Sequence, residues 1–264
     1  MSRRERSGVP PALLAPAGLA LLFLIVPLLG LFLRAPWRSL PDRLREHAIR
    51  EALQLSLVTA TEATVVAVVL GVPLAVVLAH GHFPGRSFLR ALVTVPLVMP
   101  PVVGGVALLS ALGRAGFVGK RIYAFNGYSL PFTTTAVVIA ETFVAMPFLV
   151  IAVEGALRGS DVRYAEAAAT LGATRWTTFR TVTLPLVAPG VMAGAVLCWA
   201  RALGEFGATI TFAGSFPGRT QTMPLAVYQA LETDPPAAIV LSMVLLIVSV
   251  AVLALLRERW VAPS

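Results

Sequence analysis

Two charged side chains lie four residues apart inside an apolar segment, and together they can bind an anion. Arg201 and Glu205 are spaced i,i+4, so in a helix they share one face. Charges inside a membrane are costly and usually face a bundle interior or water. In one interpretation Arg201 attracts an oxyanion and Glu205 holds it in place; in the other they form an ion pair that serves structure. We include Thr209 with them as a candidate anion path or outer gate.

Residues 159–185 contain a second pattern, which suits contact with another protein better than catalysis. Ser160 or Asp161 can cap a helix by accepting backbone N–H groups, and the stretch that follows is rich in alanine, the best helix former. Gly172 suits the left-handed position that ends a helix. A second short helix is expected over about 174–181. The segment is therefore predicted to be a helix–turn–helix.

The usual catalytic and metal-binding patterns are absent from the sequence. The nearest match to a phosphate-binding loop, residues 113–121, has Arg114 in place of its first glycine and Arg121 in place of its hydroxyl residue. The histidines form no cluster with metal spacing, and no serine has a positioned base. The single cysteine, Cys198, can form neither an internal disulfide nor a metal cluster. We expect no enzymatic activity, cofactor or metal in this chain.

The composition indicates a membrane protein. Of the 264 residues, 57% are hydrophobic and 13% are charged, whereas a soluble domain carries about 25% charged residues. The mean hydropathy is +0.83. The apolar residues fall in blocks of about 20, the length with which a helix crosses about 30 Å of hydrocarbon. The net charge of +8 comes from arginines between these blocks, which favours anchoring at lipid headgroups over binding of nucleic acid.

Six apolar blocks are long enough to span, so we predict an all-α membrane protein with six transmembrane helices. The blocks cover about 13–33, 54–79, 90–112, 132–154, 184–206 and 237–256. The third block contains Pro96, Pro100 and Pro101, which remove backbone hydrogen bonds that lipid cannot replace. It is expected either to pack against protein or line a wet cavity, or to be an ordinary kinked helix. Residues 41–53 can form a short helix at the interface.

The N-terminus carries arginines before an apolar run, as a signal peptide does. The run is longer than a typical signal sequence, and no small-residue cleavage site follows it. We therefore expect a retained first helix, a cytoplasmic tail over 1–12 and a single transmembrane domain over 13–260. Arginines on the side of the N-terminus slightly outnumber those on the other side, which favours a cytoplasmic N-terminus.

The predicted helix–turn–helix also follows a longer spaced pattern. Its members are Glu166-Ala167-Ala168, Gly172, Val182 and Leu184-Pro185. This resembles the EAA signature of ABC-importer permeases, with valine for isoleucine as the one departure. The resemblance implies a MetI-like permease fold in which residues 159–183 form a cytoplasmic coupling loop. In physical terms, alanines give the helix a slim face for close approach, Gly172 permits a tight reversal, and Glu166 offers a charge to the partner.

Residues 200–228 carry a second resemblance, which concerns the cargo. They read ARALGEFGATITFAGSFPGRTQTMPLAVY and are similar, nearly residue for residue, to the molybdate-type permeases. Sulfate permeases share the core Arg-Ala-x-Gly-Glu-Phe/Tyr-Gly. Ser215-Phe216 departs from the molybdate-type pattern, in which Asn and an aliphatic residue are common. The likeness covers roughly 50–260 and implies molybdate transport, with tungstate or sulfate/thiosulfate as alternatives and a secondary anion carrier as a distant one.

The resemblance implies partners as well. ATP and Mg would be bound by a separate ABC ATPase subunit, and two copies of it need two coupling loops, so we expect a homodimer. An extracytoplasmic oxyanion-binding protein would deliver the anion to a path that opens alternately on each side of the bacterial cytoplasmic membrane. Both termini would be cytoplasmic, and no nucleic acid partner is expected. Glu62 and Glu141, in or near spans, are expected to make polar contacts between helices.

Overall fold

The structure is a computed structural model that describes residues 10–38, 40–43 and 45–261, and within these ranges it contains helices and no strands. The all-α prediction is therefore confirmed. The predicted N-terminal tail, 1–12, lies outside the described residues as far as residue 9. The helices are α1 (Leu14–Arg34), α2 (Leu40–Arg43), α3 (His47–His80), α4 (Arg86–Val98), α5 (Pro101–Leu112), α6 (Gly119–Asn126), α7 (Thr134–Gly159), α8 (Val162–Thr170), α9 (Arg175–Thr178), α10 (Leu184–Leu203), α11 (Gly207–Phe212), α12 (Met223–Thr233) and α13 (Pro235–Val261).

Five helices among the described residues are long and apolar enough to cross a membrane. They are α1, α3, α7, the continuous segment Arg175–Leu203 that includes α10, and α13. Several extend beyond the predicted blocks; α3 begins at His47, so most of the 41–53 segment belongs to its first turns and not to a separate interfacial helix. A helix can continue past the end of its apolar block into the aqueous layer. Its backbone hydrogen bonds run within the helix and do not require apolar side chains.

The third predicted block is a broken helix and not a straight span. The helix axis bends by 117° between α4 and α5. Met99 and Pro100 each precede a proline, and both have extended backbone, with ψ of 133° and 131°. A proline ring disfavours the helical conformation of the residue before it, so two prolines in succession force the break. With both pieces counted as one span, the described chain has six.

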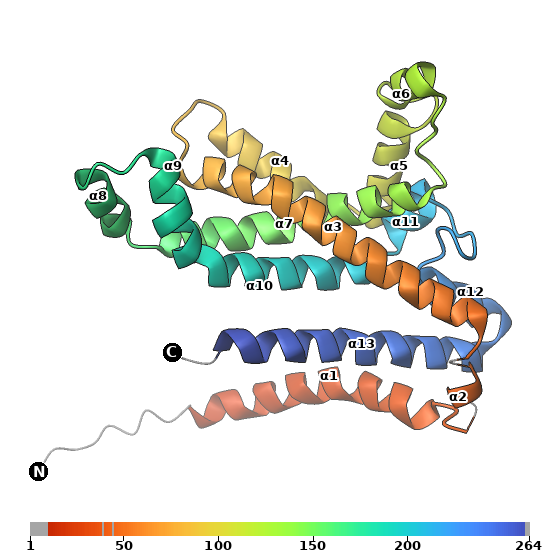
Figure 1. The fold of residues 1–264 in the computed structure, drawn as a ribbon. Helices are drawn as coiled ribbons and strands as arrows, with labels where there is room; N and C mark the ends of the chain where they lie inside the picture. Colours follow the sequence, from red (N-terminus) through yellow and green to blue (C-terminus); the bar gives the residue numbers. More distant parts are fainter. Residues whose placement is uncertain (1–9, 39, 44, 262–264) are drawn as a thin grey trace, which may run out of the picture.

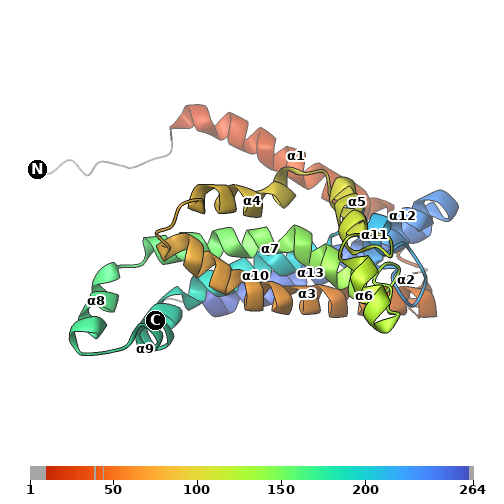
Figure 2. The same ribbon diagram turned by 90° about the horizontal axis from the view of Figure 1, so that it is seen from above.

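The spanning helices run roughly side by side, and the two ends of the bundle differ (Figure 1). α8 and α9 lie at one end, together with the start of α1 and the end of α13; we call this the hairpin end. α5, α6, α11 and α12 gather at the other end, which we call the opposite end. The view from above gives the same arrangement (Figure 2). α10 therefore connects the predicted coupling loop to the predicted anion path.

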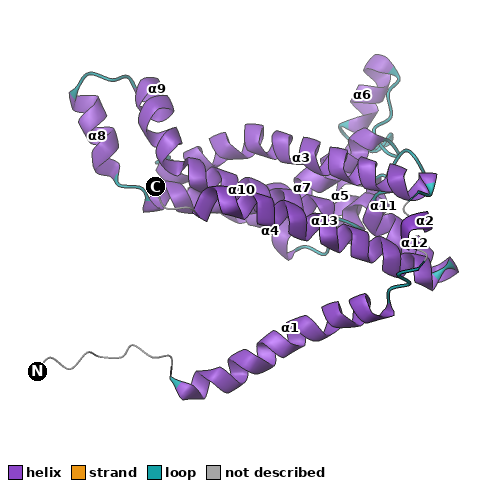
Figure 3. Ribbon diagram, turned by 60° about the horizontal axis from the view of Figure 1, so that its bottom comes forward, coloured by secondary structure: helices purple, strands orange, loops and turns teal. Residues whose placement is uncertain are grey.

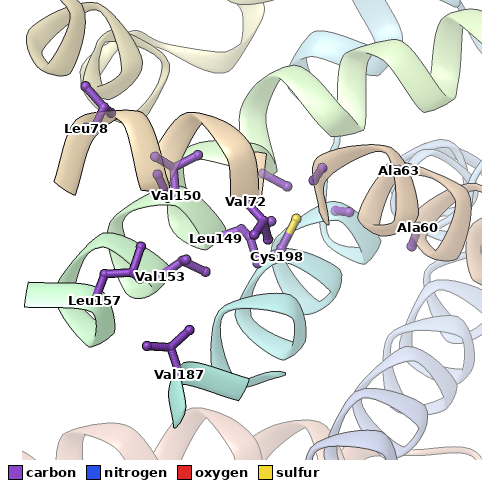
Figure 4. Packing of buried hydrophobic residues seen from close by; sticks show 14 of the residues in the cluster. Ala60, Ala63, Val72, Leu78, Leu149, Val150, Val153, Leu157, Val187 and Cys198 are labelled. Carbon is purple, nitrogen blue, oxygen red and sulfur yellow. The ribbon is translucent and has the colours of Figure 1, made fainter. Parts of the chain in front are cut away.

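The main core lies where α3, α7 and α10 pack together (Figure 4). Small side chains dominate the α3 face of this core, among them Ala60, Ala63 and Ala67, all fully buried. Lipid tails are as apolar as leucine, so helices in a membrane associate by close van der Waals packing, which small residues permit.

The contact between α7 and α10 is the tightest example of this packing. Gly190 and Gly194 of α10 face Ala156 and Ala152 of α7. A Cβ on Gly190 would overlap the Cβ of Ala156, and one on Gly194 would lie 3.0 Å from the Cβ of Ala152. This Gly-xxx-Gly pattern lets two backbones approach closely. The spacing of Gly190 and Gly194 can be read in the sequence, but it is not among the predictions above.

α1 is the exception, because its contacts with the bundle are few and are mainly with α13. None of its residues is buried, and it diverges from the other helices toward its N-terminal end (Figure 3). Its apolar side chains are therefore free to contact lipid or another protein.

We predict that Gly190→Ala destabilises the fold. The added methyl group has to displace α7 from α10, and overpacking of this kind costs about 1–3 kcal/mol. The effect is measured as a lower temperature of thermal unfolding of the purified protein in detergent. Gly155→Ala in α7 is the matched control, because no atom lies within 4 Å of its built Cβ. Equal unfolding temperatures for the two variants would contradict the prediction.

Candidate functional site

The first helix of the hairpin begins with a side-chain cap. Asp161 accepts a hydrogen bond from the backbone N–H of Arg163 at 3.0 Å and forms an ion pair with the Arg163 guanidinium at 2.7 Å. The hydrogen bonds from Arg163 hold the pKa of the Asp161 carboxyl below its usual value, so this carboxylate stays ionised at neutral pH. The predicted cap at Asp161 is confirmed.

The reversal between α8 and α9 depends on glycine. Gly172 has φ of +81°, the left-handed conformation that glycine adopts without strain. Its N–H donates to the carbonyl of Ala169 at 3.0 Å, and the N–H of Ala173 donates to that of Ala168 at 3.1 Å. These bonds satisfy carbonyls that the end of a helix leaves unpaired. The predicted helix–turn–helix is therefore present.

The hairpin presents a charged and apolar surface at the end of the bundle. Glu166 and Ala167 are exposed and Ala168 is half-buried. A hollow of about 530 Å³ between the hairpin and the end of α3 is lined in part by Glu166, Arg175 and Phe179. Leu171, at the tip, is 89% exposed. Large apolar side chains exposed beside charges indicate a protein interface. Leu171 was missed at the sequence level, because only its neighbour Gly172 belongs to the motif.

One π-helical turn, Phe179–Thr183, joins the hairpin to α10. The backbone N–H of Leu184 donates to the carbonyl of Phe179, five residues earlier. Pro185 follows and has no N–H to donate, so the regular α-helical pattern is interrupted here. Such turns are rare and often lie at functional sites. Val182 of the spaced pattern lies within this turn.

At the opposite end of α10, Arg201 and Glu205 are in direct contact. Arg201 Nη2 lies 2.7 Å from Glu205 Oε2. The other oxygen, Oε1, accepts the backbone N–H of Ala208 at 2.8 Å, so Glu205 also caps the start of α11. Glu205 is 1% exposed, whereas the Arg201 side chain is 27% exposed. Only the arginine is therefore accessible to an anion in this conformation.

Thr209 lies on the helix that Glu205 caps and is fully buried. Its hydroxyl has no hydrogen-bond partner among the described residues. α11 is pressed against α5, since a Cβ on Gly105 would lie 2.6 Å from the Cβ of Thr211. The structure thus places Thr209 in the same local unit as Arg201 and Glu205, while Glu166, Ala167, Ala168 and Gly172 lie together at the other end of α10.

Buried polar side chains of α3 and α7 form further hydrogen bonds between elements, and the sequence predicted only some of these contacts. Glu141 of α7 is 1% exposed and accepts a hydrogen bond from Thr59 of α3 at 3.0 Å. Ser56 of α3 accepts the backbone N–H of Met223 at 2.7 Å. The contact predicted for Glu141 is confirmed. Glu62 is exposed and makes no hydrogen bond or ion pair with the described residues, so the contact predicted for it is not found.

Comparison with known families gives a match over most of the chain. Residues 67–263 match the model of the family described as binding-protein-dependent transport system inner membrane component. The molybdenum transport system permease protein ModB of Mycobacterium tuberculosis is 48% identical over 90% of this chain and 89% of its own length. ModB of Escherichia coli K12 is 40% identical over 80% of this chain and 93% of its own. The sulfate transport system permease protein CysT of Escherichia coli K12 is 34% identical over 93% and 91%.

Solved structures of similar fold are ABC transporters. A bacterial transporter involved in the import of the acidic polysaccharide alginate superposes with a TM-score of 0.75, at 16% identity, over 96% of this chain and 95% of that one. The same transporter in complex with an alginate pentasaccharide-bound periplasmic protein gives a TM-score of 0.73, at 16% identity, over 94% and 92%. These likenesses show the fold.

We predict that Glu205→Ala destabilises the protein more than Glu205→Gln. The alanine variant leaves the buried N–H of Ala208 without an acceptor, which costs about 1–3 kcal/mol, and it also leaves Arg201 unpaired. Glutamine keeps an acceptor for that N–H. The measurement is thermal unfolding in detergent. If the alanine variant unfolds at the same temperature as the unmodified protein, the capping role assigned to Glu205 is wrong.

Proposed function

The chain belongs to the binding-protein-dependent transport system inner membrane components, and from this premise we propose that it is the transmembrane subunit of an ATP-driven importer that moves molybdate across the cytoplasmic membrane. The permease subunit is not an enzyme by itself. The hydrolysis of ATP belongs to partner subunits, and the assembled complex would be the translocase.

One observation carries the choice of cargo. The relatives named as molybdenum permeases are 48% and 40% identical to this chain, whereas the sulfate permease is 34% identical. The molybdate-type stretch 200–228 contains the Arg201–Glu205 pair and the helix that Glu205 caps. We propose that Arg201, in this stretch, meets the anion. Sulfate is the more distant alternative.

The hairpin is the part of the chain best suited to hold an ATPase subunit. It is a capped, compact body with exposed Glu166 and Leu171, and it joins α10 directly. Two ATPase subunits would each hold one hairpin, and so we propose two copies of this chain in the complex. A soluble binding protein would dock at the other face; the alginate transporter of similar fold has been solved in complex with a periplasmic protein.

Orientation follows from the position of the hairpin. An ATPase that uses cellular ATP works in the cytoplasm, so the hairpin end would face inward. The start of α1 and the end of α13 lie at that same end (Figure 1), and both termini would then be cytoplasmic. Arg201 would lie near the outer mouth. There, its accessible guanidinium would attract an oxyanion, and Glu205 would hold the guanidinium in position.

The transport cycle would use two states of the bundle. ATP binding closes the ATPase pair and moves the two hairpins, and the helices pass from inward-open to outward-open. The binding protein then releases its anion into the cavity, and hydrolysis resets the complex. Motion of this kind requires that nucleotide and anion each bind one state more tightly than the other.

We predict that the reconstituted complex takes up molybdate only with ATP and the binding protein present. Tungstate is expected to compete, since its tetrahedral dianion is nearly the same size as that of molybdate, and excess sulfate to compete poorly, since its tetrahedral dianion is smaller. The measurement is uptake of labelled molybdate into proteoliposomes. Equal competition by sulfate would favour the sulfate alternative, and uptake that needs no ATP would favour a secondary carrier.

We also predict that Arg201→Ala abolishes oxyanion uptake, while assembly and basal ATPase activity persist, because the alanine removes the accessible positive charge. Arg201→Lys should retain part of the uptake. Arg219→Ala is the matched control, since Arg219 is also exposed at the opposite end but belongs to no ion pair among the described residues. Normal uptake by Arg201→Ala would refute a role for Arg201 in the anion path.

A further inference from the structure

A buried carboxylate near the end of α7 is held by two arginines. Glu154 is 7% exposed. Its Oε1 atom accepts hydrogen bonds from Arg90 of α4, at 3.0 Å from Nε and 2.5 Å from Nη2. The same oxygen lies 2.9 Å from Nη2 of Arg158, one turn further along α7. Glu154 therefore ties α4 to α7 at the hairpin end of the bundle.

The arginines of α4 also bind the end of α3. Arg86 donates to the carbonyls of Leu78 and Ala79, each at 2.8 Å. Arg90 adds a hydrogen bond of 3.3 Å to the Leu78 carbonyl. These carbonyls lie in the last turn of α3 and have no N–H partner within the helix. Guanidinium groups suit this position, because the end of a helix carries partial negative charge.

Three helix ends thus meet in one charged cluster, which we call the Glu154 cluster: Glu154, Arg86, Arg90 and Arg158. It contains three positive side chains and one negative side chain. The helix ends of α3 and α7 supply further negative potential. Loss of the carboxylate would leave guanidinium groups close together without a counter-charge. The Arg90 and Arg158 side chains are 37% and 48% exposed, so solvent screens part of their repulsion.

The cluster lies between the hairpin and the broken span. Arg158 is in the last turn of α7, directly before the hairpin begins. α4 runs from Arg86 toward the break at Met99 and Pro100, beyond which α5 packs closely on α11. α4 is therefore the part of the broken span that a movement of the hairpin can reach, and the break is where α4 can turn relative to α5.

We propose that Glu154 is a positioning residue that makes α4 move together with α7 and the hairpin as one body. Movement of the hairpin is then transmitted through α4 to the break at Met99 and Pro100. This break lies next to α11, the helix that Glu205 caps and that belongs to the proposed anion path. This inference rests on the proposed function, because it gives the hairpin its role in the cycle. The residues of the Glu154 cluster lie outside the EAA motif, and in this proposal they help to couple the ATPase to the anion path.

The test of rigidity uses spin labels on both sides of the cluster. Ser87 of α4 and Thr170 of α8 are exposed and can be changed to cysteine in a Cys198→Ser background, which leaves no other cysteine in the chain. In the complex with its ATPase, the distance between the labels should be the same without nucleotide and when trapped with ATP and vanadate. In Glu154→Gln the distribution of label distances should become broader, or its mean should differ between the nucleotide-free and the trapped complex. A shift in the otherwise unmodified complex overturns the proposal.

The functional test measures uptake per ATP hydrolysed. Glu154→Gln should keep basal ATPase activity and lose about 5- to 150-fold in molybdate uptake per ATP, the usual range of coupling between sites. Asp234→Asn is the matched control: it also removes a carboxylate that joins two elements, through one ion pair with Arg43 at 2.7 Å, and it lies at the opposite end. Its uptake per ATP should not change. Unchanged coupling in Glu154→Gln overturns the proposal.

A substitute variant and the label distances together distinguish failure of this proposal from failure of the proposed function. If Glu154→Gln does not assemble, Arg90→Lys replaces it. Lysine keeps the charge but has three donors on one nitrogen in place of the planar fork that contacts both Glu154 and the Leu78 carbonyl, so its coupling should be intermediate. Coupling equal to that of the unmodified complex would then overturn the proposal. If the unmodified complex takes up no molybdate, the proposed function fails instead, and the label distances still decide whether α4 and the hairpin move as one body.

Discussion

Glycines of α10 pack directly against alanines of α7, and this close contact positions α10 within the bundle. In lipid, apolar side chains do not drive helices together, so association needs backbones that approach closely. Gly190 and Gly194 provide this approach opposite Ala156 and Ala152. The contact fixes α10, and α10 carries the hairpin at one end and the Arg201–Glu205 pair at the other. A well-packed α10 can therefore transmit movement along its whole length.

The charged residues near the ends of the bundle divide into two kinds. Glu205 and Glu154 are buried and hold other groups in place, one by capping α11 and the other by binding arginines of α4 and α7. Arg201 and Glu166 are accessible, so each can meet another molecule. Structural and functional interpretations of the Arg201–Glu205 pair are thus compatible, because the carboxylate is occupied while the guanidinium keeps an accessible side.

The chain combines a packed core of α3, α7 and α10 with a broken span, α4 and α5, that can bend. α3, α7 and α10 share a continuous core. α4 and α5 are separated by extended residues at Met99 and Pro100. The Met99 N–H makes the last hydrogen bond of α4, to the Val95 carbonyl, and the Pro100 carbonyl accepts the first of α5, from the Gly104 N–H. In the proposed mechanism, bending takes place at this break, between the hairpin end and the anion path. An importer that alternates between two states needs such a point, since packed cores do not deform continuously.

Features that depend on neighbouring residues could be predicted from the amino-acid sequence alone: the apolar spans, the Asp161 cap, the reversal at Gly172 and the family motifs. Each has a local cause, such as a run of apolar side chains or the conformation of a single glycine. Three features required the three-dimensional arrangement of the helices: the 117° bend in the third block, the capping of α11 by Glu205, and the ion pair of Glu154 with Arg90. Arg90 and Glu154 are 64 residues apart. Contacts of this kind depend on how whole helices are placed and rotated against one another, and no local pattern specifies that placement.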